Sequence, residues 1–242
     1  MITDINTVIW REIIHLMRGS RSILVITRYL AFTLIFGVII PWQSGRAWLD
    51  SPLPLIYWIW LAVYLASAAT SGSFAREREL HTFETLLATR LPDAAILLGK
   101  ILAGVIYGGG LVLVSVLFGQ VVLLFKGGAG PAYYNPTTVF GGYLASLLAA
   151  FAMGTLASFV SLKAQTARQA QASLSFVILI LFLPLVIAQF LPALQQQMLA
   201  GALQANPGLM VFITLLLLTL LDLGLWFLAR GRFQRNCLIQ IV

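Results

Sequence analysis

The residues best suited to recognition chemistry lie in one polar segment, residues 75–92. Three of the chain's eight acidic residues fall in this segment: Glu77, Glu79 and Glu84. Its apolar residues recur at helical spacing, at Leu80, Phe83, Leu87 and Leu91. This pattern predicts a short amphipathic helix that Pro92 ends, because proline cannot continue a helix. A helix with this charge density is suited to docking a soluble partner; the alternative is a connecting loop that is merely helical.

Charged residues within otherwise apolar stretches form a second candidate group, Arg28, Lys100 and Asp222. A carboxylate at the centre of a membrane span costs about 2.5–3.5 kcal/mol on insertion scales, so Asp222 should be neutralised or paired. Arg28 and Lys100 are its two candidate partners. Ion pairing within the protein and a role in substrate or proton handling both remain open.

An intramembrane enzyme would need a nucleophile with a base, paired aspartates or a metal cluster within the bilayer. Asp222 is the only acidic residue deep in an apolar stretch, and both histidines lie outside these stretches. The sequence therefore predicts neither catalytic residues nor a metal site.

The elements that must position these side chains are long apolar segments. Six stretches are long enough to cross a bilayer: 23–42, 53–74, 96–125, 139–162, 173–191 and 209–229. About 20 apolar residues span the hydrocarbon core, and only helices can do so as single crossings. Sixty percent of the 242 residues are hydrophobic and 10% are charged. We therefore predict an all-α membrane protein with six transmembrane helices, forming one domain over 1–242 that leaves no room for a soluble catalytic domain.

The distribution of basic residues predicts the orientation in the membrane. Numbered from a cytoplasmic N-terminus, the cytoplasmic side holds thirteen Lys and Arg residues, and the opposite side holds only Arg46 and Lys126. This asymmetry is typical of a positive-inside topology and places both termini in the cytoplasm. The net charge of +7 is then explained by topology and by anionic membrane lipids, and nucleic acid is not expected as a partner.

A helix is also expected before the first apolar stretch, at 4–18. Ile5, Ile9, Ile13 and Leu16 fall on one side at helical spacing, and polar residues fall on the other. Such a helix either lies in the membrane interface, with its apolar face among the acyl chains, or packs on the protein itself.

The fourth apolar stretch carries a stripe of small residues at intervals of four. They are Gly142, Ser146, Ala150, Gly154 and Ser158. Small residues at this spacing allow another helix to approach closely, so the stripe predicts helix packing and not chemistry.

The polar segment resembles the cytoplasmic signature of type-2 ATP-binding-cassette (ABC) transporter permeases. The resemblance rests on Glu77-Arg78-Glu79, on Thr82-Phe83-Glu84-x-Leu86-Leu87-x-Thr89, and on Gly99-Lys100. Two positions depart from the family pattern: His81 stands where glycine is usual, and Arg90 where proline is usual. The six-span layout, the N-terminal helix and the cytoplasmic termini are also similar, so the resemblance covers nearly the whole chain.

The resemblance implies a permease, an exporter of a prokaryotic cytoplasmic membrane, that works with a separate ATPase. ATP and Mg would be bound by that partner, since the chain has no phosphate-binding loop of the form G-x-x-x-x-G-K-[ST]. Segment 75–92 would be the coupling helix that docks on the ATPase, and two permeases, either copies or homologues, would pair with two ATPases. Segment 192–208 would be extracytoplasmic. The residues that would make the coupling contact are Glu77, Arg78, Glu79, Phe83, Glu84 and Leu87.

The alternative reading is a secondary transporter or channel that works without an ATPase. Such a protein should show buried ion-binding carboxylates and repeated halves. The sequence shows one deep carboxylate and no repeat.

Overall fold

The computed structural model describes residues 2–19, 30–45, 48–49, 53–80, 91–126, 133–164, 166–188 and 207–232. Within these ranges the structure is helical and contains no strand. The helices are α1 (Ile2–Gly19), η1 (Ile35–Ile39, a π-helix), α3 (Ile40–Ser44), α5 (Leu53–Ser71), α6 (Ser73–Glu79), α8 (Asp93–Lys126), α9 (Pro136–Lys163), α10 (Ala167–Ala188) and α12 (Pro207–Arg232).

Four helical stretches are long and apolar enough to cross a membrane. They are Pro54–Glu77, Asp93–Lys126, Pro136–Lys163 and Val211–Ala229. These correspond to the second, third, fourth and sixth predicted spans. An all-helical fold is therefore confirmed for the described residues, with four candidate membrane spans.

The first and fifth predicted spans contain shorter apolar helices, Leu30–Ser44 and Ala167–Leu183. Residues 20–29 and 189–206 lie outside the described residues, and with them part of these two predicted spans and most of segment 192–208, which was predicted to be extracytoplasmic. Six complete spans therefore remain a prediction.

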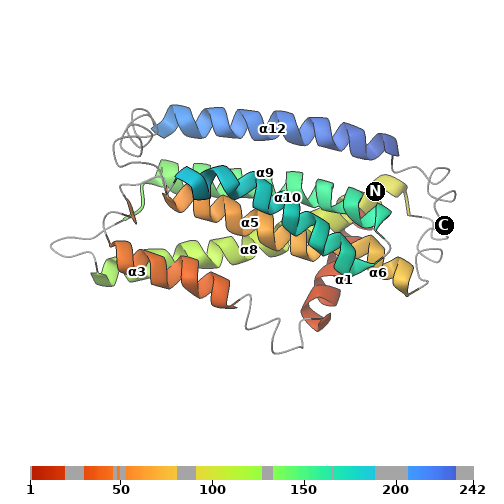
Figure 1. Ribbon diagram of the computed structural model, residues 1–242, viewed down its shortest axis with the longest axis horizontal. Helices are drawn as coiled ribbons and strands as arrows, with labels where there is room; N and C mark the ends of the chain where they lie inside the picture. Colours follow the sequence, from red (N-terminus) through yellow and green to blue (C-terminus); the bar gives the residue numbers. More distant parts are fainter. Residues whose placement is uncertain are drawn as a thin grey trace.

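Helix α9 occupies the centre of the bundle. It packs most extensively against α5 and also contacts α8, α10 and α12. Helix α12 lies along α9 on the outside of the bundle (Figure 1). The outward side of α12 is apolar and exposed, for example at Leu217 and Leu220. An apolar surface of this kind is suited to lipid.

The stripe of small residues lies on the buried side of α9. All five members are buried in the structure: Gly142, Ser146, Ala150, Gly154 and Ser158. A Cβ placed on Gly142 would lie 3.1 Å from the ring of Trp58 on α5, and one placed on Gly154 would lie 3.3 Å from Ile101 on α8. Larger residues at these points would separate α9 from its neighbours.

Helix α8 is continuous over 34 residues, about 51 Å at 1.5 Å per residue. It therefore exceeds a hydrocarbon core of about 30 Å. The glycine triplet at 108–110 does not interrupt it. Instead, Gly108 lies against the backbone of α5, where an added Cβ would be 3.2 Å from the carbonyl oxygen of Ala62.

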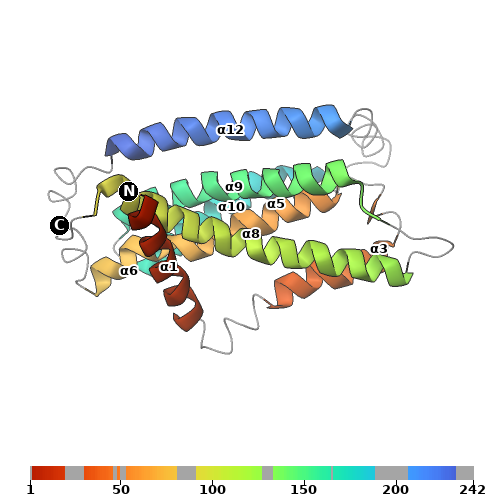
Figure 2. The same cartoon turned by 180° about the vertical axis from the view of Figure 1, so that it is seen from behind.

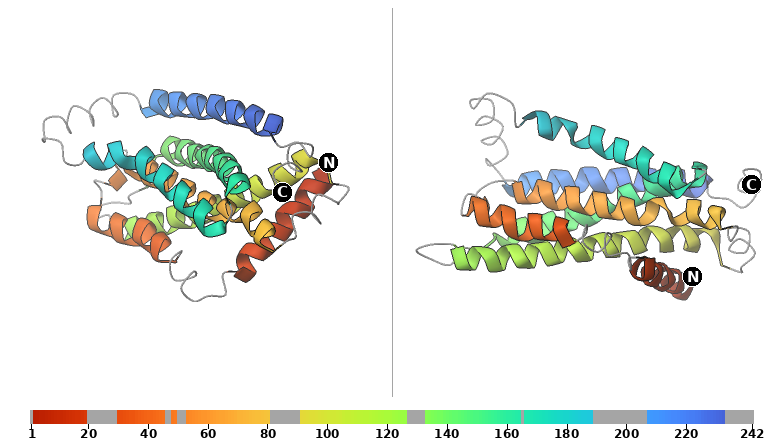
Figure 3. Two further views of the ribbon diagram at one scale, coloured as in Figure 1. Left: turned by 45° about the vertical axis from the view of Figure 1, so that its right-hand side comes forward. Right: turned by 60° about the horizontal axis from the view of Figure 1, so that its bottom comes forward.

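Helix α1 lies across the end of α8 and not along the bundle (Figures 2 and 3). Val8 is buried against Gly99 of α8, while Trp10 is 67% exposed. The helix expected at 4–18 is thus present, and one face of it packs on the protein. Its position in the membrane interface remains a prediction.

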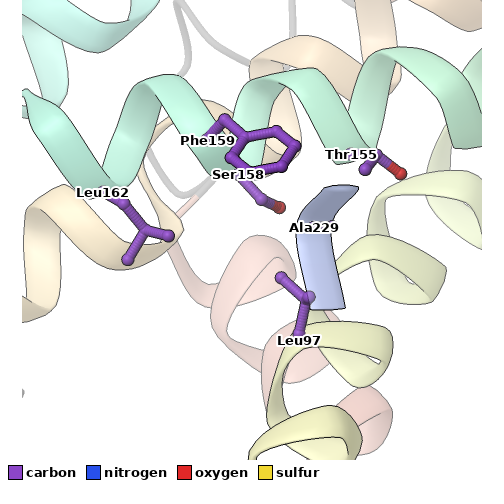
Figure 4. A pocket seen from close by; sticks show the side chains of 6 residues that line it. All are labelled: Leu97, Thr155, Ser158, Phe159, Leu162 and Ala229. Atoms are coloured by element: carbon purple, nitrogen blue, oxygen red, sulfur yellow. The ribbon is translucent and has the colours of Figure 1, made fainter. Parts of the chain in front are cut away.

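A small void lies between α8, α9 and α12, lined by Leu97, Thr155, Ser158, Phe159, Leu162 and Ala229 (Figure 4). Its volume is about 10 Å³, which is close to the minimum for a single water molecule. The void is therefore a packing imperfection and not a substrate site.

We expect Gly99→Ala to loosen α1 from α8, because the new Cβ would lie 2.6 Å from the Cβ of Val8. The overpacking should lower the free energy of unfolding by about 1–3 kcal/mol. Gly110→Ala is the matched control in the same helix, since no atom lies within 4 Å of a Cβ there. Alanine should be neutral or stabilising by up to about 1 kcal/mol at that position. Equal effects of the two changes on the unfolding of the purified protein would contradict this packing.

Candidate functional site

Helix α6 forms the first part of the polar segment. It follows α5 after a turn at Gly72. The first amides of a helix have no partner within the helix and need one from outside. Ser161 of α9 supplies it, because its Oγ accepts hydrogen bonds from the backbone N–H of Phe74 at 3.2 Å and of Ala75 at 3.0 Å. This contact fixes the start of α6 on α9.

Lys100 of α8 lies beneath α6 and is 2% exposed. An ammonium group carries three N–H donors, and Lys100 has an acceptor for each of them. Nζ donates to Glu12 Oε1 of α1 at 2.9 Å and to the backbone oxygen of Ser73 at 3.1 Å, and it lies 3.0 Å from Glu77 Oε1 of α6. We call Lys100, Glu12 and Glu77 the Lys100 network.

The surroundings of the Lys100 network offset the cost of burying charge. Arg11 of α1 lies 3.6 Å from Glu77 Oε1, so two cationic side chains stand against two carboxylates. The Lys100 ammonium also lies 4.7 Å from the centre of the Phe74 ring, a cation–π distance. A buried charge is tolerated only when it is paired and hydrogen-bonded in this way. The network therefore holds α1, α6 and α8 in one arrangement.

Two further contacts join α6 to its neighbours. Glu79 Oε1 accepts a hydrogen bond at 3.0 Å from the backbone N–H of Ala167, the first residue of α10. Arg76 lies 3.3 Å from Nδ1 of His15 on α1. Helix α6, seven residues long, thus contacts α1, α8, α9 and α10 through polar groups.

The residues expected to make the coupling contact fall into different environments. Glu77 is buried in the Lys100 network, whereas Glu79 is exposed. Arg78 belongs to α6, and its side chain is not among those described. Residues 81–90, with Phe83, Glu84 and Leu87, lie outside the described residues.

The predicted helix over 75–92 differs from the structure at both ends. Helix α6 begins earlier, at Ser73, and ends at Glu79. Leu91 and Pro92 are not helical, so extending the helix to Leu91 was wrong. The residue before a proline is disfavoured in the helical conformation. The carbonyl of Pro92 instead accepts the first hydrogen bonds of α8, from the N–H groups of Ala95 and Ile96.

Of the two candidate partners of Asp222, the structure excludes Lys100. All three ammonium donors of Lys100 are used by α1 and α6, while Asp222 lies on α12, which packs on α9. Asp222 is 7% exposed, and neither carboxylate oxygen has a hydrogen-bond partner in the described part of the chain. Arg28, the other candidate partner, lies outside the described residues.

Sequence reasoning missed Glu12 and Ser161. A signal for Glu12 was present, because it follows Ile5 and Val8 at helical spacing and so belongs to the packed face of α1. A charged residue on a packing face needs a buried partner. Ser161 carried no comparable signal. Within the described ranges, no grouping of three His, Cys, Asp or Glu residues is suited to hold a metal ion.

Replacing Lys100 should destabilise the protein more than replacing an exposed lysine. Lys100→Met removes the cation that Glu12 and Glu77 share and leaves only Arg11 beside Glu77, which should cost about 3–5 kcal/mol of unfolding free energy. Adding Glu12→Gln and Glu77→Gln should recover much of this loss. Lys163→Met, at the exposed end of α9, is the control and should be nearly neutral. Unfolding of the purified variants in detergent measures these effects, and similar stabilities for Lys100→Met and Lys163→Met would refute the network.

Comparison with known proteins places the chain in a family. The profile of the ABC-2 type transporter family matches residues 3–187, a range that includes α5, α6, α8, α9 and all but the first residue of α1. No curated protein matches the chain. The family comprises the transmembrane components of these transporters and not their ATPases. The chain therefore belongs to the ABC-2 type transporter family and is an integral membrane protein, the permease component of an ABC transporter.

Proposed function

We propose that this chain is the permease subunit of an ATP-driven exporter and that a separate ABC ATPase drives it through segment 75–92. ATP and Mg would be bound by the ATPase alone. The observation that carries the proposal is the fixing of α6 to α1, α8, α9 and α10. A helix held at four sides cannot move without moving its neighbours.

This arrangement would transmit movement of the ATPase to the helices of the permease. The partner would contact residues 81–90, which continue directly from α6 and Leu80 in the sequence. Closure of the ATPases around ATP would displace this segment, and the Lys100 network would pass the displacement to α1 and α8. Packed helices shift as rigid bodies between discrete arrangements. Nucleotide binding would change their populations by its different affinity for the two arrangements.

Two kinds of side chain would make the docking contact with the ATPase. We assign Phe83 or Leu87 as the apolar anchor and Glu84 as the residue that sets orientation, because charges supply register and association rate more than affinity. Glu77 receives a different role, since its carboxylate is buried against Lys100. It would transmit movement and would not contact the ATPase.

The proposed assembly has two permeases, copies or homologues, and two ATPases, with the substrate path between the permeases. The membrane is a prokaryotic cytoplasmic membrane, with both termini and segment 75–92 on the cytoplasmic side. The excess of basic residues on that side supports this orientation.

Reconstitution tests the proposal. The purified chain in liposomes should neither hydrolyse ATP nor transport directionally, and both activities should appear when an ABC ATPase that copurifies with it is added. Glu84→Lys should lower transport-coupled ATP hydrolysis at least several-fold without affecting membrane insertion. Asp50→Lys is the matched control, because the same charge reversal falls on the side predicted to be extracytoplasmic.

Three results would contradict the proposal. ATP hydrolysis by the pure permease would remove the need for a partner. Concentrative transport driven by an ion gradient alone would favour a secondary transporter. Equal coupling in Glu84→Lys and wild-type protein would show that the docking surface lies elsewhere.

A further inference from the structure

A polar cleft opens between α1 and α6, next to the Lys100 network. Its volume is about 250 Å³, many times the space that one water molecule needs. Arg11 and His15 of α1 line it on one side, and Ser73 and Arg76 of α6 line it on the other. The transmission of movement described above does not require such a space.

The charges around the cleft favour an anion. Glu12 and Glu77 also line it, and both carboxylates are bound to Lys100. Arg11, Arg76 and Lys100 together leave one positive charge in excess of these two acids. The side chain of Arg11 is 60% exposed and Arg76 is also exposed, so the excess lies at the mouth of the cleft and not at its floor.

Arg76 has N–H donors available for a ligand. A guanidinium can only donate hydrogen bonds, so Nδ1 of His15 is the acceptor in its 3.3 Å contact with Arg76. This contact uses one of the five N–H donors of Arg76. Those that remain suit the paired oxygens of a phosphate, which guanidinium groups bind in a bidentate manner.

The hydroxyl of Ser73 is a second polar group available to a ligand in the cleft. The hydroxyl oxygen of Ser73 is buried and forms no hydrogen bond to any described residue. A buried hydroxyl without a partner costs about 1–3 kcal/mol, and a ligand oxygen that accepts its proton would remove this cost.

The lining of the cleft also includes apolar side chains, which favour a lipid over a free phosphate ion. Leu16 and Leu80 are part of the lining, and Leu80 is 62% exposed. Trp10, next to Arg11, is 67% exposed on α1. Exposed tryptophan beside basic residues is typical of helices at the membrane interface. A free phosphate would gain nothing from these apolar groups, whereas a lipid would.

We infer that this cleft binds the phosphate of an anionic phospholipid from the cytoplasmic leaflet. Arg76 and Arg11 hold the phosphate oxygens, the Ser73 hydroxyl donates to one of them, and the acyl chains leave over Leu16 and Leu80. The leaflet follows from the proposed orientation, but binding itself requires no ATPase. The lipid would join α1 to α6 beside the Lys100 network.

Native mass spectrometry of the full-length chain tests the inference directly. Detergent-purified protein is titrated with phosphatidylglycerol or with phosphatidylcholine, and the lipids retained after detergent removal are counted. Wild-type protein should retain one phosphatidylglycerol at least tenfold more tightly than phosphatidylcholine. Arg76→Gln should weaken this binding about tenfold, as expected for the loss of a charge-assisted hydrogen bond, and Arg11→Gln should also weaken it.

Arg168→Gln is the matched control. Arg168 is an exposed arginine near the start of α10 and is not part of the cleft. Equal losses in Arg76→Gln and Arg168→Gln would show diffuse attraction to surface charge and would overturn the site. Displacement of the lipid by millimolar inorganic phosphate, with stabilisation of lipid-free protein by phosphate alone, would overturn the lipid assignment. An Arg76→Gln protein that keeps the lipid but loses the ATPase would identify the cleft as a protein contact and would also overturn it.

Discussion

The arrangement of α1, α6 and α8 depends on one buried ammonium group. Lys100 is almost fully buried and has three oxygen acceptors for its three N–H donors, from α1, the start of α6 and the side chain of Glu77. Removing any one acceptor would leave charge in a medium that solvates it poorly. Because the acceptors come from separate helices, satisfying one cation fixes the relative positions of α1, α6 and α8. A hydrophobic contact of equal strength would not impose such a definite geometry.

Close packing of small residues makes this arrangement possible. Gly99 lets α1 approach α8 so that Glu12 reaches Lys100, the next residue along the chain. Gly142 and Gly154 similarly bring α9 against α5 and α8, and Ser161, further along α9, then meets the first amides of α6. In a bilayer, helices associate through such close contacts and through hydrogen bonds, because burying apolar surface gives no advantage over lipid. The Lys100 network therefore depends on the close helix contacts that these small residues allow.

Much of the fold follows from composition and periodicity. Long apolar stretches predict four of the observed helices, and the i+4 stripe identifies the buried side of α9. The family resemblance implied that Glu77 contacts a partner, whereas in the structure its carboxylate is bound to Lys100. Lys100 was one of two candidate partners of Asp222, because the depth of a residue along a helix can be estimated from sequence. The direction of its side chain around the helix axis cannot. The role of Ser161 depends on contact between α9 and α6 across 86 residues of chain, which no local pattern encodes.

The most direct test of the Lys100 network is hydrogen–deuterium exchange followed by mass spectrometry on wild-type and Lys100→Met protein. Exchange reports the free energy of local opening. If one cation holds α1 and α6 on α8, the amides of Ile2–Gly19 and Ser73–Glu79 should lose protection together, while those at the centre of α9 should keep theirs. Unchanged protection of both segments in Lys100→Met, or loss of protection in only one of them, would contradict the claim that this cation joins α1, α6 and α8 into one unit.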